Sequence, residues 1–199
     1  PAQTLKLFIA PDTSQYRVVT EAGPGATSEI RVAVKETAPH AAHVHVEYHV
    51  PISDPDLLAM IGKGFVAIYK QLWDEDEAMM QAREAALARR PRAPDALDLG
   101  PLAELALPMD FDLGSGCFRL VRHDGALVAH SRICPHWLGP LAGEPDAQGT
   151  LTCPWHGYRF DMVTGRSADG RGLRLAPGPA IRIENGRVIV AADRHTACA

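Results

Sequence analysis

The sequence predicts an α+β domain of antiparallel strands and one long helix, followed by an all-β domain. Strand-like runs and a helical apolar stripe fill residues 1–90, whereas short strands with glycine and proline turns fill residues 101–192. Between them, residues 91–100 contain Pro91 and Pro94 and end in Gly100, a composition typical of a linker. Residues 193–199 form a short polar tail. The chain is therefore expected to hold two domains.

The first domain begins with runs in which apolar and polar residues alternate, as in strands that bury one face. These runs cover residues 5–9, 16–20, 29–36 and 43–50. A capping box of Ser53 and Asp56, with Pro55 in the first turn, then predicts a helix that extends to Arg90. Gly62 and Gly64 are possible kinks. The residues at helical spacing that we expect to face the sheet are Leu58, Ile61, Phe65, Ile68 and Leu72.

The second domain contains two strong hairpin signals. Residues 117–122 and 126–131 flank the dipeptide Asp124-Gly125, and residues 181–184 and 187–190 flank Asn185-Gly186. Both dipeptides suit two-residue turns that need left-handed backbone angles. Together with the many glycine and proline turns, they predict a barrel-like antiparallel domain.

The most informative residues are two cysteines and two histidines in two short segments. The first segment reads Cys134-Pro-His136 and the second reads Cys153-Pro-Trp-His156. Each segment supplies one thiolate and one imidazole, the donor set of a [2Fe–2S] centre in which two thiolates hold one iron and two imidazoles hold the other. Tetrahedral zinc is the alternative for these residue types, although zinc fingers usually group like ligands in pairs.

Residues 134–141 and 151–161 closely resemble the two cluster-binding loops of Rieske ferredoxins and Rieske oxygenases. Residues 175–179 resemble the proline loop that covers the cluster in that family. The resemblance implies one [2Fe–2S] cluster per chain, held by Cys134, His136, Cys153 and His156, in a small antiparallel fold. The side chains that it places around the cluster are Leu141, Trp155, Tyr158, Phe160 and Pro177, and we expect Trp137 and Leu138 beside them.

The resemblance also bears on the reduction potential. High-potential members of the family, in cytochrome bc complexes, carry a disulfide between the loops and hydroxyl groups aimed at sulfur. Here Gly139 and Trp155 occupy the disulfide positions, Tyr158 the serine-like position, and Phe160 the tyrosine-like position without a hydroxyl. Because hydrogen bonds to sulfur raise the potential, the sequence predicts the low end of the Rieske range.

One strand-like run presents a second set of metal-binding residue types. His43, His45, Glu47 and His49 alternate and so share one face of the strand. Along an extended strand they span about 20 Å, so at most two neighbours reach one ion and other elements would have to contribute. A solvent-facing polar side of an amphipathic strand is the interpretation we favour over a zinc or mononuclear iron site.

Composition limits the remaining possibilities. A formal net charge of −4 argues against a nucleic-acid partner. The sequence contains no apolar run long enough for a membrane span. Beyond the two motif cysteines, only Cys117 and Cys198 remain, and neither indicates a disulfide. These features are typical of a protein in the reducing cytoplasm.

Two classes of function follow. The favoured hypothesis is a ferredoxin-like electron carrier that serves redox partner proteins, a reductase and an oxygenase, with the first domain used for docking or formation of a homo-oligomer. The alternative is an oxygenase-like enzyme or fragment with mononuclear iron near the His43 strand, because four strands and a long helix weakly resemble the end of a helix-grip domain. A redox sensor would use the same cluster.

Overall fold

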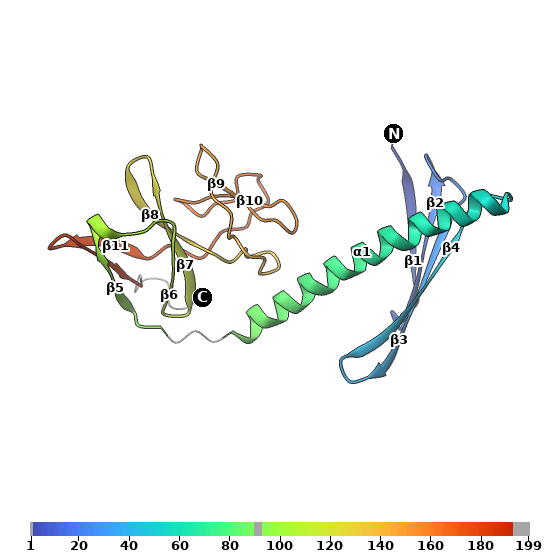
Figure 1. Cartoon of the computed structure of the whole chain (residues 1–199), viewed down its shortest axis with the longest axis horizontal. Helices are drawn as coiled ribbons and strands as arrows, with labels where there is room; N and C mark the ends of the chain where they lie inside the picture. Colours follow the sequence, from blue (N-terminus) through green and yellow to red (C-terminus); the bar gives the residue numbers. More distant parts are fainter. Residues whose placement is uncertain (1, 90–92, 193–199) are drawn as a thin grey trace. The chain divides into compact units, whose positions relative to one another are not determined.

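The computed structural model describes residues 2–89 and 93–192 and divides into two units (Figure 1). The N-terminal unit comprises Pro1–Trp73, and the C-terminal unit comprises Asp74–Ala199. The division lies within helix α1, Pro55–Ala88, and not at the predicted linker. Part of that linker, residues 90–92, and the predicted tail, residues 193–199, lie outside the described residues.

The N-terminal unit contains a four-stranded antiparallel sheet with the order β1-β2-β3-β4, as the four strand-like runs predict. The strands are β1 Thr4–Ile9, β2 Gln15–Ala22, β3 Glu29–Ala38 and β4 Ala41–His49. Helix α1 follows β4 directly. Its first turn is capped by Asp54, whose carboxylate accepts hydrogen bonds from the N–H groups of Asp56 at 2.9 Å and Leu57 at 3.1 Å. The cap is therefore Asp54 and not the predicted box that starts at Ser53.

Helix α1 packs on the sheet through aromatic contacts. The Tyr48 ring of β4 stacks on Phe65 and meets Tyr69 edge-on, each at 4.9 Å between ring centroids. Of the predicted apolar stripe, Ile61 and Phe65 are half-buried. The other members are exposed: Leu58, Ile68 and Leu72. The helical period correctly identifies the side of the helix that meets the sheet, but the sheet covers only part of that side.

Besides the second part of α1, the C-terminal unit contains three antiparallel sheets, in agreement with the predicted all-β domain. The sheets are β6-β7-β8, β11-β12-β5 and β10-β9. Their strands are β5 Ala96–Pro101, β6 Met109–Leu113, β7 Gly116–His123, β8 Ala126–Ser131, β9 Thr150–Thr152, β10 Arg159–Asp161, β11 Ala180–Glu184 and β12 Arg187–Ala191. A short 3-10 helix, Leu102–Glu104, follows β5.

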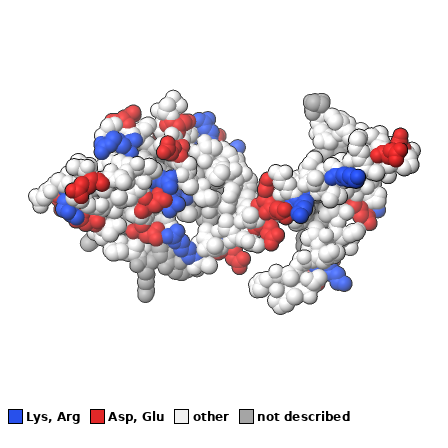
Figure 2. Space-filling view, in the orientation of Figure 1, with Lys and Arg blue, Asp and Glu red and all other residues white. Residues whose placement is uncertain are grey.

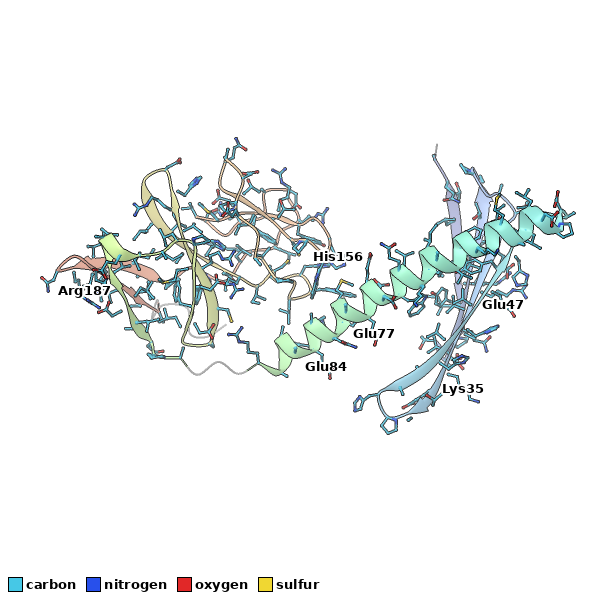
Figure 3. The ribbon with its side chains drawn as sticks, in the orientation of Figure 1. Lys35, Glu47, Glu77, Glu84, His156 and Arg187 are labelled. Carbon is cyan, nitrogen blue, oxygen red and sulfur yellow. The ribbon has the colours of Figure 1, made fainter. Side chains whose placement is uncertain are left out.

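Strand β5 corrects the predicted linker, which was drawn too long. Residues 96–100 belong to the sheet because β5 pairs with β12 along its length. An ion pair supports this pairing, since the guanidinium of Arg187 on β12 lies 2.6 Å from the carboxylate of Asp98 on β5 (Figure 3).

Both predicted hairpin turns are confirmed. Asp124 and Gly125 join β7 to β8 with φ values of 48° and 79°. Asn185 and Gly186 join β11 to β12 with φ values of 50° and 74°. Two consecutive left-handed residues give the turn twist that matches the flanking strands.

Two buried clusters form the core of the C-terminal unit. One lies among the strands and contains Phe111, Leu113, Phe118, Leu120, Ala129, Val188 and Val190. The other lies behind the two cysteine segments and contains Val121, Cys134, Leu141, Leu151, Cys153, Phe160, Met162 and Leu175. The second core thus fixes both cysteines inside apolar surroundings. None of the helices within residues 2–89 and 93–192 combines the length and hydropathy that a membrane crossing needs.

Asp110 on β6 joins two arginines. Its carboxylate accepts hydrogen bonds from Arg119 at 2.6 Å and 3.0 Å and lies 3.2 Å from Arg132. The hydrogen bond from Arg119 is the main reason why the pKa of Asp110 is lowered. We expect Asp110→Asn to reduce the free energy of unfolding at pH 7 by about 1 kcal/mol, a value kept small because solvent screens the partly exposed carboxylate.

The pH dependence of this effect has a definite sign. The pKa of Asp110 is lower in the folded state than in the unfolded state, where it is about 4. The ionised carboxylate therefore adds to the free energy of unfolding above about pH 4, and this stabilisation is lost as the pH falls through the pKa of the folded state. Urea unfolding at pH 7 and again in acid should therefore show the difference between Asp110→Asn and the parent shrinking in acid. Asp124→Asn is the control, because asparagine suits that exposed turn equally well; equal effects of the two variants would refute the role of Asp110.

Candidate metal centre

The first cysteine segment forms a tight loop after β8. The N–H of Leu138 donates to the carbonyl of Cys134 at 3.0 Å, and the N–H of Cys134 donates to the carbonyl of Gly139 at 2.9 Å. Leu138 has a left-handed φ of 64°, an uncommon conformation for a residue of its size. These bonds turn the chain so that His136 lies at the tip of the loop.

The second segment, between β9 and β10, repeats this backbone pattern. The N–H of Gly157 donates to the carbonyl of Cys153 at 3.0 Å, and the N–H of Cys153 donates to the carbonyl of Tyr158 at 2.8 Å. Gly157, with φ of 67°, takes the position that Leu138 takes in the first loop. Two loops of matching backbone geometry therefore each present one cysteine and one histidine.

The two cysteine thiols meet inside the unit. Cys134 and Cys153 are 1% and 2% exposed, belong to one buried cluster, and lie close enough for Cys153 to act on the pKa of Cys134. Burial raises the pKa of Cys134 to about 11, whereas the backbone N–H groups of His136 and Trp137, which point at its sulfur, act in the opposite direction. Without metal, Cys134 is therefore held as a thiol, and metal binding would displace its proton. The N–H groups already in place suit the thiolate that results.

The two imidazoles also meet, and one of them lacks a partner that it needs. The rings of His136 and His156 lie 4.8 Å apart and nearly perpendicular. The Nδ1 atom of His136 is buried and has no hydrogen-bond partner. His156 is exposed on a loop at the edge of the unit (Figure 3). A buried imidazole nitrogen without a partner is unfavourable unless a ligand occupies the position in front of it.

A stack of side chains covers His136. The ring of Tyr158 lies parallel to the imidazole at 4.2 Å, and the guanidinium of Arg171 lies over the Tyr158 ring at 4.1 Å. The pKa of His136 is lowered, first by burial and then by the charges of His156 and Arg171. This environment favours the neutral imidazole, which is the form that binds metal.

Trp137 lies next to both imidazoles at the surface. Its ring is 5.9 Å from that of His136 and 5.6 Å from that of His156, and the residue is 41% exposed. Of the other residues predicted around the site, Leu141 and Phe160 are buried in the core beside both cysteines, and Trp155 packs against that core.

The predicted proline loop, residues 175–179, is only partly buried. Leu175 belongs to the core that contains both cysteines, and Gly178 lies against the carbonyl of Ala129 on β8. Pro177 is exposed. The loop is therefore anchored at Leu175 and Gly178, with Pro177 at its surface.

Gly139 has a steric role that the sequence did not reveal. A Cβ atom at this position would lie 2.9 Å from the Cys153 sulfur and 3.0 Å from the Trp155 ring. No real Cβ contact is that short, so only glycine fits between the loops. A glycine in a loop has many explanations, and nothing in the sequence distinguishes this one.

The four side chains do not converge on a single point. Among the described residues, no three His, Cys, Asp or Glu side chains are arranged to hold one metal ion. The sulfurs form one pair and the imidazoles form another. Such an arrangement differs from a tetrahedral zinc site and agrees with two metal ions that each take one pair.

The histidine-rich strand shows a different geometry. His45 and His49 each lie 3.3 Å from one oxygen of the Glu47 carboxylate, and all three side chains are exposed on β4. The contacts with the two histidines lower the pKa of Glu47. The exposure of these alternating residues agrees with the interpretation favoured from the sequence, in which they form the solvent-facing polar side of an amphipathic strand.

Comparison with known proteins identifies the fold family. The model of the Rieske [2Fe-2S] domain matches residues 101–176. The ferredoxin component of the alkene monooxygenase system of Xanthobacter autotrophicus is 31% identical over 84 residues, which cover 42% of this chain and 68% of that protein. The chain belongs to the Rieske [2Fe-2S] domain family.

One further relative and one solved structure each match less than half of the chain. Human apoptosis-inducing factor 3 is 34% identical over 86 residues, or 43% of this chain, but the match spans only 14% of that protein. Among solved structures, the ferredoxin of carbazole 1,9a-dioxygenase from Nocardioides aromaticivorans is 24% identical in sequence, with a TM-score of 0.43. The match covers 49% of this chain and 98% of the ferredoxin chain.

Membership of the Rieske family implies one [2Fe–2S] cluster, and the residues of this chain fit it. The family's cluster needs two thiolates on one iron and two imidazoles on the other. The buried cysteine pair, the histidine pair and the unpartnered Nδ1 of His136 meet that requirement.

Phe160 offers a test of the low potential that the sequence predicts for this Rieske domain. Its ring is completely buried in the core that contains both cysteines. A hydroxyl in Phe160→Tyr that reaches a cysteine sulfur would favour the more negative, reduced cluster and raise the potential. A net hydrogen bond of about 1 kcal/mol corresponds to about 40 mV, on the scale of 59 mV per tenfold change for one electron. Redox titration measures the shift, and Phe111→Tyr in the other core is the control. An unchanged potential would show that the hydroxyl does not reach sulfur.

Proposed function

We propose that this chain carries single electrons through a Rieske [2Fe–2S] cluster held by Cys134, His136, Cys153 and His156. The observation that carries the proposal is the pairing of these side chains from two loops of matching backbone geometry, with the buried Nδ1 of His136 left without a partner. When bound, such a cluster supplies reversible one-electron redox chemistry.

The surrounding residues have distinct roles in this proposal. The buried core around Cys134 and Cys153 excludes water from the sulfur side of the centre. The exposed edge of His156 is the point at which electrons enter and leave. Trp137, which contacts both imidazoles and is partly exposed, extends that edge to the surface. Exchange with a docked partner therefore takes place at the histidine side.

The partners in this proposal are a reductase as donor and an oxygenase as acceptor, both in the cytoplasm. Support comes from the 31% identical relative, which is the ferredoxin component of a monooxygenase system. All four ligands of the proposed cluster belong to the C-terminal unit.

An anaerobic redox titration followed by EPR spectroscopy tests the proposal, on the full chain purified without added metal. We expect a Rieske-type signal in the reduced state and a midpoint near the lower end of the family range of roughly −150 to +300 mV. Zinc in place of iron, with no signal, would overturn the proposal. A midpoint near the upper end would instead contradict the argument from Phe160.

Iron analysis separates the carrier from an oxygenase-like enzyme. A carrier contains only the iron of its cluster, whereas a mononuclear site near β4 would add a further iron. On β4 the exposed His45 and His49 each lie 3.3 Å from the Glu47 carboxylate, as on the polar side of an amphipathic strand. We therefore propose the carrier.

A further inference from the structure

The two units differ sharply in how much apolar surface they bury. Of the described residues of the N-terminal unit, Val32 is the only buried apolar one, and α1 contains no buried residue at all. The C-terminal unit has two complete cores. The N-terminal unit therefore leaves much more of its apolar surface in contact with water than the C-terminal unit does.

The uncovered apolar surface begins on β1. Leu7 lies in register with Val18 of β2, Ile30 of β3 and Tyr48 of β4, so all four share the face on which α1 packs. Tyr48 is covered by α1, but Leu7 is 56% exposed. Leu5 and Ile9, on the same face of β1, are equally exposed. Helix α1 therefore covers the β4 side of this face and leaves the β1 side bare.

Helix α1 carries more apolar surface than the sheet can cover. Ile68 and Leu72 lie on the helix side that includes Phe65, yet they are about half exposed, as is Leu58 one turn before Ile61. On the face of the N-terminal unit seen in Figure 2, most of the surface is neither acidic nor basic. The unit thus presents one bare edge strand, β1, and an apolar helix flank that covers no strand, whereas Tyr16 and Val18 of β2 are half-buried.

We propose that the N-terminal unit is a homodimerisation module, in which the exposed flank of α1 in each copy covers the apolar face of β1 in the other. Both halves of the contact are present on one chain, which is the requirement for a self-complementary two-fold interface. In such a dimer the exposed side chains of β1 are covered by the helix of the second copy, and the exposed side chains of α1 pack on its sheet. The dimer would hold two redox centres in one particle and leave each cluster-binding loop in its own C-terminal unit.

The available area agrees with a stable dimer. The side chains that would enter the interface from each copy are Leu5, Leu7, Ile9, Leu58, Ile68 and Leu72. These side chains are 43–59% exposed, so the apolar surface that they present is on the order of 500 Å² per copy, near the upper end of the largest apolar patch on a typical monomer. With the polar rim that such interfaces carry, this approaches the roughly 800 Å² per partner of a standard interface.

Sedimentation analysis of the cluster-containing full chain tests the proposal. We expect a dimer, and we expect Leu7→Glu and Ile68→Glu each to weaken the association by at least about tenfold, because each places a charge in the apolar contact. Matched controls lie on the same elements but on the opposite side: Lys6→Gln on β1 and Lys70→Gln on α1 should leave the dimer intact. Since Leu7 and Ile68 are exposed in the single chain, helix content and the EPR signal should not change.

A disulfide cross-link tests the geometry. Chains with Leu7→Cys are mixed with chains carrying Ile68→Cys, in a background with Cys198→Ser, and we expect a disulfide between the two kinds of chain. Mixing Lys6→Cys with Ile68→Cys should give none. A chain that stays monomeric overturns the proposal, as does a dimer that Leu7→Glu leaves unaffected. Neither result changes the redox titration, so failure of the dimer is distinguishable from failure of the electron carrier.

Discussion

The His156→Ala protein is expected to lose its [2Fe–2S] cluster. Each iron of the cluster takes two protein ligands. Without the His156 imidazole, its iron keeps only His136, and water is a poorer ligand for the open position. His156 is exposed, and its loop is held by the backbone bonds of Cys153, so the chain should fold without it. Iron and sulfide analysis, visible absorption and EPR measure the loss, which should be nearly complete.

The matched control is His43→Ala on β4. His43 is exposed and belongs to the polar side of the N-terminal sheet, so its removal should leave the iron content unchanged. A His156→Ala protein with full colour would show that the ligand assignment is wrong. Loss of iron in His43→Ala would point instead to a metal site on β4 and would revive the oxygenase-like hypothesis.

The parts of the structure that sequence reasoning predicted depend on local patterns. Asp124-Gly125 and Asn185-Gly186 form the expected turns because a two-residue hairpin needs left-handed angles that these residues adopt easily. The four strands before α1 follow from alternation over a few residues. The candidate ligands follow from the spacing of one cysteine and one histidine within each short loop. In each case the information lies within one segment.

The parts that sequence reasoning missed depend on contacts between distant segments. Helical spacing places Leu58, Ile68 and Leu72 on the correct side of α1, but it does not reveal how far the sheet extends beneath them. The pairing of β5 with β12 joins residues far apart in the chain, and the proline pattern of residues 91–100 concealed it. Leu138 adopts a left-handed φ without any signal in its residue type, because the loop around Cys134 imposes it.

Gly139→Ala is the second large effect that we expect, because it tests the contact between the two loops. The added methyl group would lie 2.9 Å from the Cys153 sulfur and 3.0 Å from the Trp155 ring, so one loop must move away from the other. Displacement of the Cys153 thiolate weakens the binding of iron. Overpacking of this kind typically lowers the free energy of unfolding by about 1–3 kcal/mol. We expect a smaller fraction of chains with a complete cluster after purification and a faster loss of visible absorption on heating.

Gly143→Ala provides a control with the same chemical change. No atom lies within 4 Å of a Cβ at Gly143, and neither glycine has a left-handed φ, so backbone strain does not distinguish the two variants. Gly143→Ala should therefore keep the cluster content and thermal behaviour of the parent. If both variants lose the cluster equally, the loss is caused by the reduced flexibility of a loop without its glycine and not by the contact with Cys153. If Gly139→Ala matches the parent, the loops have more room than the structure shows, and Gly139 is not what separates them.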